Sequence, residues 1–227
     1  MVDRLDARAY IGRFAPTGNF FVAGFQDRRV RVYRTAAAAK PWRLHKEILA
    51  KQLNWTITDT AMTADDQFLA YATISPVVQL VNLNASSEVH SVQNVTDIHE
   101  PLDFSMEDDP RGERRMHGIW SIKMSRSAER VIAGTSDPYS IAEFDVPANR
   151  VVLDVQAHDD DVNSVAYLDD SENVVLSGSD DAAIKLWDKR LLGISGSPGE
   201  GEAKPAGVFY VSRSPSEGLW ACVGDTD

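Results

Sequence analysis

The sequence predicts an all-β fold, and three observations support this prediction. Short runs of alternating apolar residues are separated by turns rich in Asp, Ser and Gly, a pattern typical of strands joined by hairpins. The pattern recurs four times along the 227-residue chain. In each copy, an apolar residue before the first turn and another near the end of the last strand lie 19 or 20 positions apart. A spacing that is kept in four places indicates a structural repeat.

The clearest copy spans residues 157–190, with the sequence AHDDDVNSVAYLDDSENVVLSGSDDAAIKLWDKR. Its alternating runs VNSVAY, VVLSGS and IKLWD are separated by two acidic turns, as expected for consecutive strands. Weaker copies lie near residues 9–34, 55–83 and 117–146. The paired anchors of the four copies are Phe14 and Tyr33, Met62 and Val81, Met124 and Phe144, and Tyr167 and Trp187.

The distance between copies predicts a β-propeller. Met124 and Tyr167, the first anchors of the last two copies, lie 43 positions apart. This distance matches the roughly 40–45-residue period of a four-stranded propeller blade. We therefore expect residues 1–190 to form an incomplete propeller with about four recognisable blades.

Three segments fall outside the repeat. Residues 84–115 are expected to be an insertion, whose acidic stretch MEDDP at 106–110 is a loop between blades. Residues 191–227 are expected to be a linker and a poorly ordered non-repeat tail, although the run VFYV at 208–211 can start a strand. Residues 34–51 form either a blade connection or a short helix, and the sequence does not decide between them.

Composition narrows the class of protein. Hydrophobic residues make up 43% of the chain and charged residues 25%, an ordinary balance for a globular domain. No apolar run approaches the roughly 18–20 residues that cross a bilayer, and the N-terminus lacks an apolar signal core. The net charge of −11 disfavours binding to phosphate backbones. We expect a protein of the nucleus or cytoplasm that binds neither nucleic acid nor membranes.

The residues do not favour an enzyme. His158, Ser177 and Asp181 have the composition of a hydrolase triad, but the chain contains no Gly-x-Ser-x-Gly turn to present a nucleophile. The histidines show no metal-ligand spacing, and the single cysteine, Cys222, excludes a multi-cysteine site. We therefore predict no catalytic residue, no metal and no cofactor.

The unit 157–190 closely resembles the WD repeat, with its His, Ser-Gly-Ser, Asp and Trp-Asp in the expected order. The resemblance implies a structural tetrad in which hydrogen bonds link His158, Ser177, Asp181 and Trp187. A buried Trp N–H needs an acceptor, which the Ser hydroxyl supplies. The third copy departs from this pattern, because Ala133 and Phe144 stand where Ser and Trp are expected.

Three longer strings resemble one particular group of WD-repeat proteins. They are FFVAGFQDRRVRVY at 20–33, NWTITDTAMTADDQFLAYATISPVVQLVNL at 54–83 and NVTDIHEPLDF at 94–104. The group consists of substrate receptors similar to the eleventh cullin-4-associated factor, with their plant relatives. The similarity covers most of the chain, from about residue 9 to residue 204. It implies a non-catalytic receptor that docks on the propeller adaptor of a cullin-4 RING ubiquitin ligase and presents protein substrates for ubiquitination and proteasomal degradation.

The docking motif of that group is Trp-Asp-x-Arg at the end of a blade, and here it is Trp187-Asp188-Lys189-Arg190. The resemblance therefore implies adaptor binding through Trp187, Asp188 and Arg190, while the substrate stays unknown. Two alternatives remain open: a generic WD-repeat scaffold that binds proteins without a ligase, and a truncated product without function. Because the group usually has an N-terminal extension and about seven blades, the chain is expected to be a fragment, a truncated isoform or an incomplete gene model.

Overall fold

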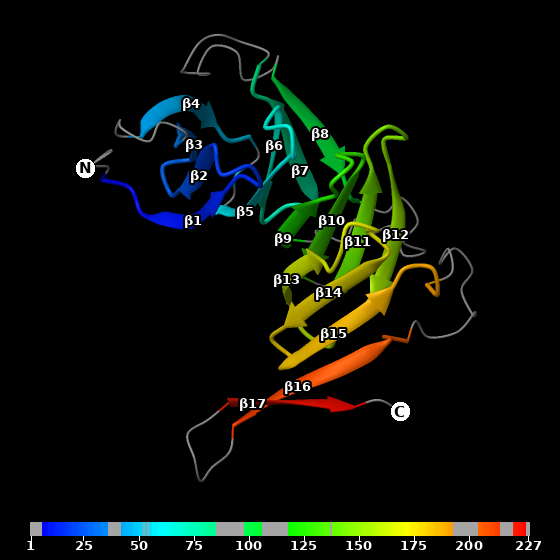
Figure 1. The fold of residues 1–227 in the computed structure, drawn as a ribbon. Coiled ribbons are helices and arrows are strands. Elements are labelled where there is room, and N and C mark those ends of the chain that lie inside the picture. The colour runs from blue at the N-terminus through cyan, green and yellow to red at the C-terminus, as the bar shows by residue number, and fades with distance from the viewer. Residues whose placement is uncertain are drawn as a thin grey trace.

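The computed structural model describes residues 6–35, 42–51, 53, 55–84, 98–105, 118–136, 138–192, 204–213 and 220–225. These residues form strands β1 to β17, arranged in four antiparallel sheets (Figure 1). The all-β fold class is confirmed. No helix in the described ranges is long and apolar enough to cross a membrane.

Each sheet is built from strands that follow one another in the chain, which is the simplest way to join antiparallel neighbours. Sheet 1 contains β1 (Ala9–Phe14), β2 (Phe20–Phe25), β3 (Arg29–Arg34) and β4 (Arg43–Leu49). Sheet 2 contains β5 (Ile57–Met62), β6 (Phe68–Thr73), β7 (Val77–Asn82) and β8 (His99–Asp103). Sheet 3 contains β9 (Ile119–Met124), β10 (Arg130–Thr135), β11 (Ser140–Asp145) and β12 (Arg150–Gln156). Sheet 4 contains β13 (Val162–Tyr167), β14 (Val174–Ser179), β15 (Ala183–Asp188), β16 (Gly207–Arg213) and β17 (Trp220–Asp225).

The first hairpin of every sheet repeats one turn geometry. In each, a backbone N–H donates to the carbonyl three residues earlier, and the donor residue has a positive φ of 58–74°. The four donor residues are Gly18, Asp66, Ala128 and Glu172. A turn followed by a left-handed residue matches the twist of a β-hairpin, so four different sequences converge on one conformation. This repetition supports the structural repeat that the anchor spacing predicts.

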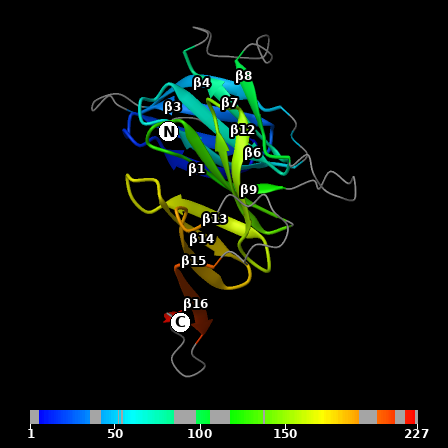
Figure 2. The same ribbon diagram turned by 90° about the vertical axis from the view of Figure 1, so that its right-hand side faces the viewer.

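The four sheets lie side by side with their first strands innermost, as the two views show (Figures 1 and 2). Strand β5 contacts β1 on one side and β9 on the other, and β9 in turn contacts β13. The sheets are thus arranged as successive propeller blades, and the arc is not closed into a ring. We call the side that carries the four first hairpins, at residues 15–19, 63–67, 125–129 and 168–173, the hairpin face.

Three apolar layers hold neighbouring sheets together. Val30 and Val32 of sheet 1 pack against Leu69 of sheet 2, and Phe104 meets Phe144 between sheets 2 and 3 with ring centroids 5.3 Å apart. The third layer places Trp187 of sheet 4 with residues of sheet 3, such as Ile132. The approach is so close at Gly134 that a Cβ there would lie 2.6 Å from the carbonyl oxygen of Val162, which explains the glycine.

The structure corrects the predicted boundaries of the repeats. The segment 84–115 is not only an insertion, because residues 99–103 form β8, the outer strand of sheet 2. The tail 191–227 is not only a linker, because residues 207–213 form β16, which pairs with β15 and itself pairs with β17. Residues 43–49 form β4 rather than a helix. The acidic stretch at 106–110 lies outside the described residues.

Candidate functional site

The four residues of the predicted tetrad meet in sheet 4. Ser177 lies on β14 and Trp187 on the adjacent β15, while His158 precedes β13 and Asp181 occupies the turn between β14 and β15. The Trp187 indole N–H donates to Ser177 Oγ at 2.8 Å, and Ser177 Oγ lies 2.7 Å from His158 Nε2. The chain of contacts ends where His158 Nδ1 lies 2.7 Å from an Asp181 carboxylate oxygen.

The order of donors fixes the tautomer of His158. Because Ser177 Oγ already accepts the Trp187 N–H, its own hydrogen is free to be donated to His158 Nε2. His158 then carries its hydrogen on Nδ1 and donates it to Asp181. Burial lowers the pKa of His158, an effect that the Asp181 carboxylate only partly opposes, so the neutral imidazole that this network needs is favoured.

The stability of the protein is expected to fall when the pH drops through the ordinary histidine value. Burial lowers the pKa of His158, and also that of His45, below 6.5, so the unfolded chain binds protons that the folded chain does not. The free energy of unfolding is therefore highest above pH 6.5, where both histidines are neutral in the folded and the unfolded chain. It falls progressively as the pH drops below that value. A melting-temperature series across this range should show the fall, with a shallower dependence in His158→Gln. An unchanged dependence in that variant would contradict the assignment to His158.

The other sheets fill the tetrad positions in different ways. In sheet 3, Ala133 and Phe144 occupy the places of Ser177 and Trp187, and both are fully buried. In sheet 1, Asp27 stands in the turn that corresponds to Asp181, where it binds the buried guanidinium of Arg31 at 2.6 Å instead of a histidine. The hydrogen-bonded tetrad is therefore a special feature of sheet 4 within the described residues.

The tetrad has no catalytic geometry. Ser177 is 1% exposed, and its oxygen is already engaged by Trp187 and His158, so it is not presented to a substrate. Among the residues that the structure describes, no group of three or more His, Cys, Asp or Glu side chains is placed to hold a metal ion. The arrangement stabilises the sheet through satisfied buried polar groups.

The Trp-Asp-x-Arg motif is divided between the core and the surface. Trp187 is 1% exposed, so its place in the motif is to fix the backbone that leads to Arg190, and its role in adaptor binding stays a prediction. Arg190 has 66% of its side chain exposed and lies just beyond β15 on the hairpin face. The two carboxylate oxygens of Asp188 accept hydrogen bonds from the Arg190 guanidinium, one from Nε at 2.9 Å and the other from Nη2 at 2.6 Å. This hydrogen-bonded pair raises the pKa of Arg190 and lowers that of Asp188.

Lys189, the variable residue of the motif, ties sheet 4 to sheet 3. Its Nζ lies 2.5 Å from a carboxylate oxygen of Glu143 on β11, and the same oxygen accepts a hydrogen bond from the Tyr167 hydroxyl at 3.0 Å. Burial, together with the negative charge of Glu143, raises the pKa of Tyr167, which keeps the phenol protonated as a donor. The backbone that carries Arg190 is therefore anchored from two directions.

A second polar centre, which the sequence analysis did not single out, joins the inner strands. Asp59 on β5 is 3% exposed. One of its oxygens lies 3.2 Å from a guanidinium nitrogen of Arg13 on β1, and the other accepts from the Ser121 hydroxyl on β9 at 3.0 Å. The same oxygen lies 3.5 Å from Lys123 Nζ. A single carboxylate thus bridges sheets 1, 2 and 3.

The bridge extends to the fourth sheet through Ser121, whose oxygen accepts the backbone N–H of Val165 on β13 at 3.3 Å. Burial lowers the pKa of Lys123, and the charge of Asp59 partly opposes that effect. One signal in the sequence could have pointed to this centre. Asp59 is an acidic residue inside a strand of otherwise apolar or hydroxyl residues, ITDTAM, where an unpaired charge would be costly.

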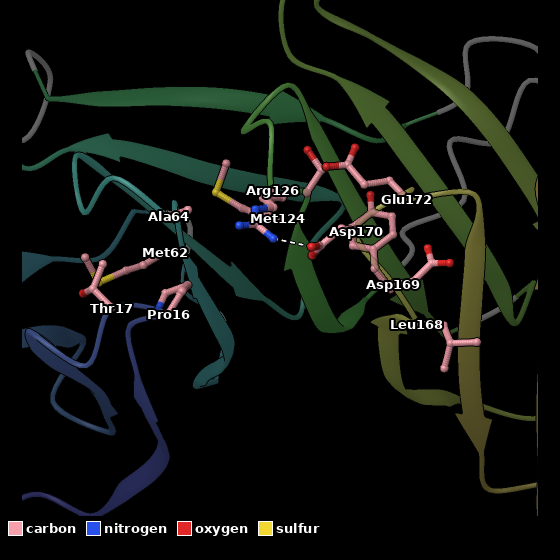
Figure 3. Close-up of a pocket in the computed structure, with 12 residues that line it drawn as sticks. Pro16, Thr17, Met62, Ala64, Met124, Arg126, Leu168, Asp169, Asp170 and Glu172 are labelled. Carbon is pink, nitrogen blue, oxygen red and sulfur yellow. Dashed lines mark hydrogen bonds and ion pairs between the residues drawn. The ribbon is translucent and has the colours of Figure 1, made fainter.

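The hairpin face also contains a cavity of about 480 Å³ (Figure 3). Its lining comes from the first hairpins of all four sheets. The lining residues are Pro16, Thr17, Met62, Ala64, Met124, Ser125, Arg126, Tyr167, Leu168, Asp169, Asp170 and Glu172. The sequence analysis missed this site, because its members are separated by whole repeats and share no motif.

Comparison with known proteins agrees with this architecture. The family model described as "WD domain, G-beta repeat" matches residues 149–188, the span that contains β12 to β15 and the tetrad. This chain contains a WD repeat. The match shows that one WD repeat takes its first strand from the outer edge of sheet 3 and its other three strands from sheet 4.

Two plant relatives of this chain are similar over most of its length. The LEC14B protein of Lithospermum erythrorhizon is 41% identical over 210 residues, which cover 92% of this chain and 41% of the relative. The LEC14B homolog of Prunus armeniaca is 41% identical over 197 residues, which cover 87% and 40%. The chain thus spans about two fifths of the length of these relatives.

A third relative has a name that refers to a complex. The protein named DDB1- and CUL4-associated factor 11 homolog in Caenorhabditis elegans is 32% identical over 218 residues, which cover 93% of this chain and 35% of the relative. Together, these relatives confirm the resemblance that the strings at 20–33, 54–83 and 94–104 indicate.

Proposed function

We propose that this chain is a protein-interaction module that docks on DDB1, the adaptor of a cullin-4 ubiquitin ligase, and takes part in presenting substrates for ubiquitination. Support comes from relatives named as DDB1- and CUL4-associated factors, together with the Trp-Asp-x-Arg motif. The protein would perform no chemical step itself. Holding a substrate near the ligase raises its effective concentration there, which is how a receptor contributes to the reaction.

The observation that carries the proposal is the placement of Arg190. Its backbone is fixed by the buried Trp187 on one side of the motif and by the Lys189 contact to Glu143. Its guanidinium is held over the surface by Asp188, so little side-chain freedom is lost when a partner binds. An exposed arginine that is oriented in advance is a typical energetic centre of a protein interface.

A titration of the chain with purified DDB1 tests this proposal. Arg190→Ala is expected to bind about tenfold more weakly or worse, a loss of roughly 1.4 kcal/mol or more. Arg126→Ala is the matched control, because its side chain is 68% exposed, lies on the same face and is likewise paired with one aspartate. Near-normal binding by this control would assign the loss to Arg190. A folded wild-type chain that does not bind DDB1 would contradict the proposal.

The alternative is a WD-repeat scaffold without a ligase, and one observation favours it. Asp188 already accepts hydrogen bonds from Nε and Nη2 along one edge of the Arg190 guanidinium, as a purely structural motif would also require. The two functions predict different effects of Asp188→Asn on binding to DDB1. In the receptor, this variant changes DDB1 affinity by loosening Arg190, whereas the scaffold shows no DDB1 binding with or without the substitution.

A further inference from the structure

The cavity on the hairpin face has an apolar floor that can adapt to its contents. Met62 and Met124 are the last residues of β5 and β9, and Leu168 follows the last residue of β13. Leu168 is 55% exposed, which is unusual for a large aliphatic side chain beside a cavity. Thioethers are flexible and polarizable, so a methionine pair can pack against apolar side chains of different shape.

One rim of the cavity is negatively charged. Asp169, Asp170 and Glu172 lie on the side of the cavity that also carries Leu168, opposite Met62, and the sole cation among the lining residues is Arg126 (Figure 3). The charge of the lining is therefore −2, from three carboxylates and one guanidinium. Arg126 is paired with Asp170, and Glu172 accepts hydrogen bonds from Ser127.

Asp169 is the carboxylate best placed for a partner. Its oxygen accepts from the backbone N–H and the hydroxyl of Ser171 at 3.0 and 2.7 Å, which holds the side chain in place. Within the described residues Asp169 forms no ion pair, although its charge helps to raise the pKa of the nearby Arg190. An apolar floor beside an anionic rim complements a ligand with an aliphatic group next to a positive charge.

We propose that this cavity binds a protein segment in which an aliphatic side chain is flanked by lysine or arginine. The aliphatic side chain packs on Met62, Met124 and Leu168, and the cations lie along the rim of Asp169, Asp170 and Glu172. The volume of about 480 Å³ falls in the range of roughly 300–1,000 Å³ that ligand sites occupy. Arg190 is not among the lining residues, but the charge of Asp169 acts on it, so binding to this cavity is tested without DDB1.

Fluorescence anisotropy with a labelled probe peptide, GSKRLRKSG, tests the proposal on the full chain without DDB1. Two matched peptides remove one feature each: GSKRSRKSG lacks the aliphatic side chain, and GSQQLQQSG lacks the cations. Both are expected to bind about tenfold more weakly than the probe, a loss of roughly 1.4 kcal/mol. Equal binding of GSKRLRKSG and GSKRSRKSG would show attraction to the acidic protein as a whole and would overturn the proposal, as would no binding of the probe.

Two variants locate the peptide in the cavity. Ala64→Trp places a large ring at an exposed lining position and should abolish binding, while Asp169→Asn should weaken it several-fold. Asp160→Asn is the matched control, because this exposed aspartate makes the same change of charge at the opposite end of β13. Melting curves establish that each variant is folded. If Asp160→Asn weakens binding as much as Asp169→Asn does, the cavity is not the site.

Discussion

Replacing Trp187 with alanine is expected to destabilise the protein by about 3–5 kcal/mol, the cost of removing a large aromatic side chain from a packed core. Trp187 is 1% exposed and lies between sheets 3 and 4, where its indole N–H donates a hydrogen bond to Ser177 Oγ. The loss approaches the whole stability of many domains, which is about 5–15 kcal/mol. Urea denaturation followed by far-UV circular dichroism would measure it.

Two further variants separate packing from hydrogen bonding in this prediction. Trp187→Phe keeps most of the apolar volume but removes the N–H, so it should cost about 1–3 kcal/mol. Trp55→Ala is the control, since Trp55 is 52% exposed and should change stability by less than about 1 kcal/mol. If Trp187→Ala were no more harmful than Trp55→Ala, the inter-sheet layer around Trp187 would not be stabilising the fold.

The second large effect is expected at Asp59. Asp59→Asn removes the charge that Arg13 and Lys123 share, and it leaves the Ser121 hydroxyl with an altered partner. Breaking a fully buried ion pair typically costs about 3–5 kcal/mol, but the side chains of Arg13 and Lys123 are 35% and 28% exposed, so a loss of about 1–3 kcal/mol is expected here. The free energy of unfolding, measured in urea, is the quantity to compare.

Asp66 offers a control for this prediction because it also links two sheets. It accepts hydrogen bonds from Thr17 at 2.8 Å, but this contact is exposed, so Asp66→Asn should cost less than about 1 kcal/mol. A double-mutant cycle of Asp59→Asn with Arg13→Gln should show a coupling energy of about 1 kcal/mol or more. Additive effects would mean that Arg13 and Asp59 do not stabilise one another.

The predicted repeats near 9–34, 55–83, 117–146 and 157–190 contain the first three strands of every sheet, whereas the outer strands fall outside them, although the sequence indicates that the run VFYV at 208–211 can start a strand. The second strands, β2, β6 and β10, are near-continuous apolar runs, because their side chains contribute to the layers on both sides of a sheet. The outer strands give a weaker signal: β8 reads HEPLD, and β12 reads RVVLDVQ with exposed residues at both ends. Long connections precede β8 and β16, so a fixed period could not locate these two strands.

Features of the site that lie within one repeat could be predicted from the sequence, whereas features that join several repeats could not. The tetrad could be expected because His158, Ser177, Asp181 and Trp187 lie within the one repeat, 157–190, that closely resembles the WD repeat. The Asp59 centre and the hairpin-face cavity join residues of three or four repeats, and their contacts depend on how the sheets are rotated against one another. Periodicity in a single sequence contains no information about that rotation.

The open arc of sheets has a consequence for how the chain responds to mechanical force. Among the described residues, sheets 1 and 4 each pack mainly against one neighbour, whereas sheets 2 and 3 are held on both sides and contain Asp59 and Ser121 at the centre of the polar bridge. In repeat proteins, stability is divided between units and their nearest interfaces. A chain pulled from its two ends should therefore release the end sheets first. Sheet 1 spans residues 9–49 and sheet 4 spans residues 162–225. Their release would lengthen the chain by on the order of 140 and 220 Å, respectively, a stepwise extension that optical tweezers can resolve.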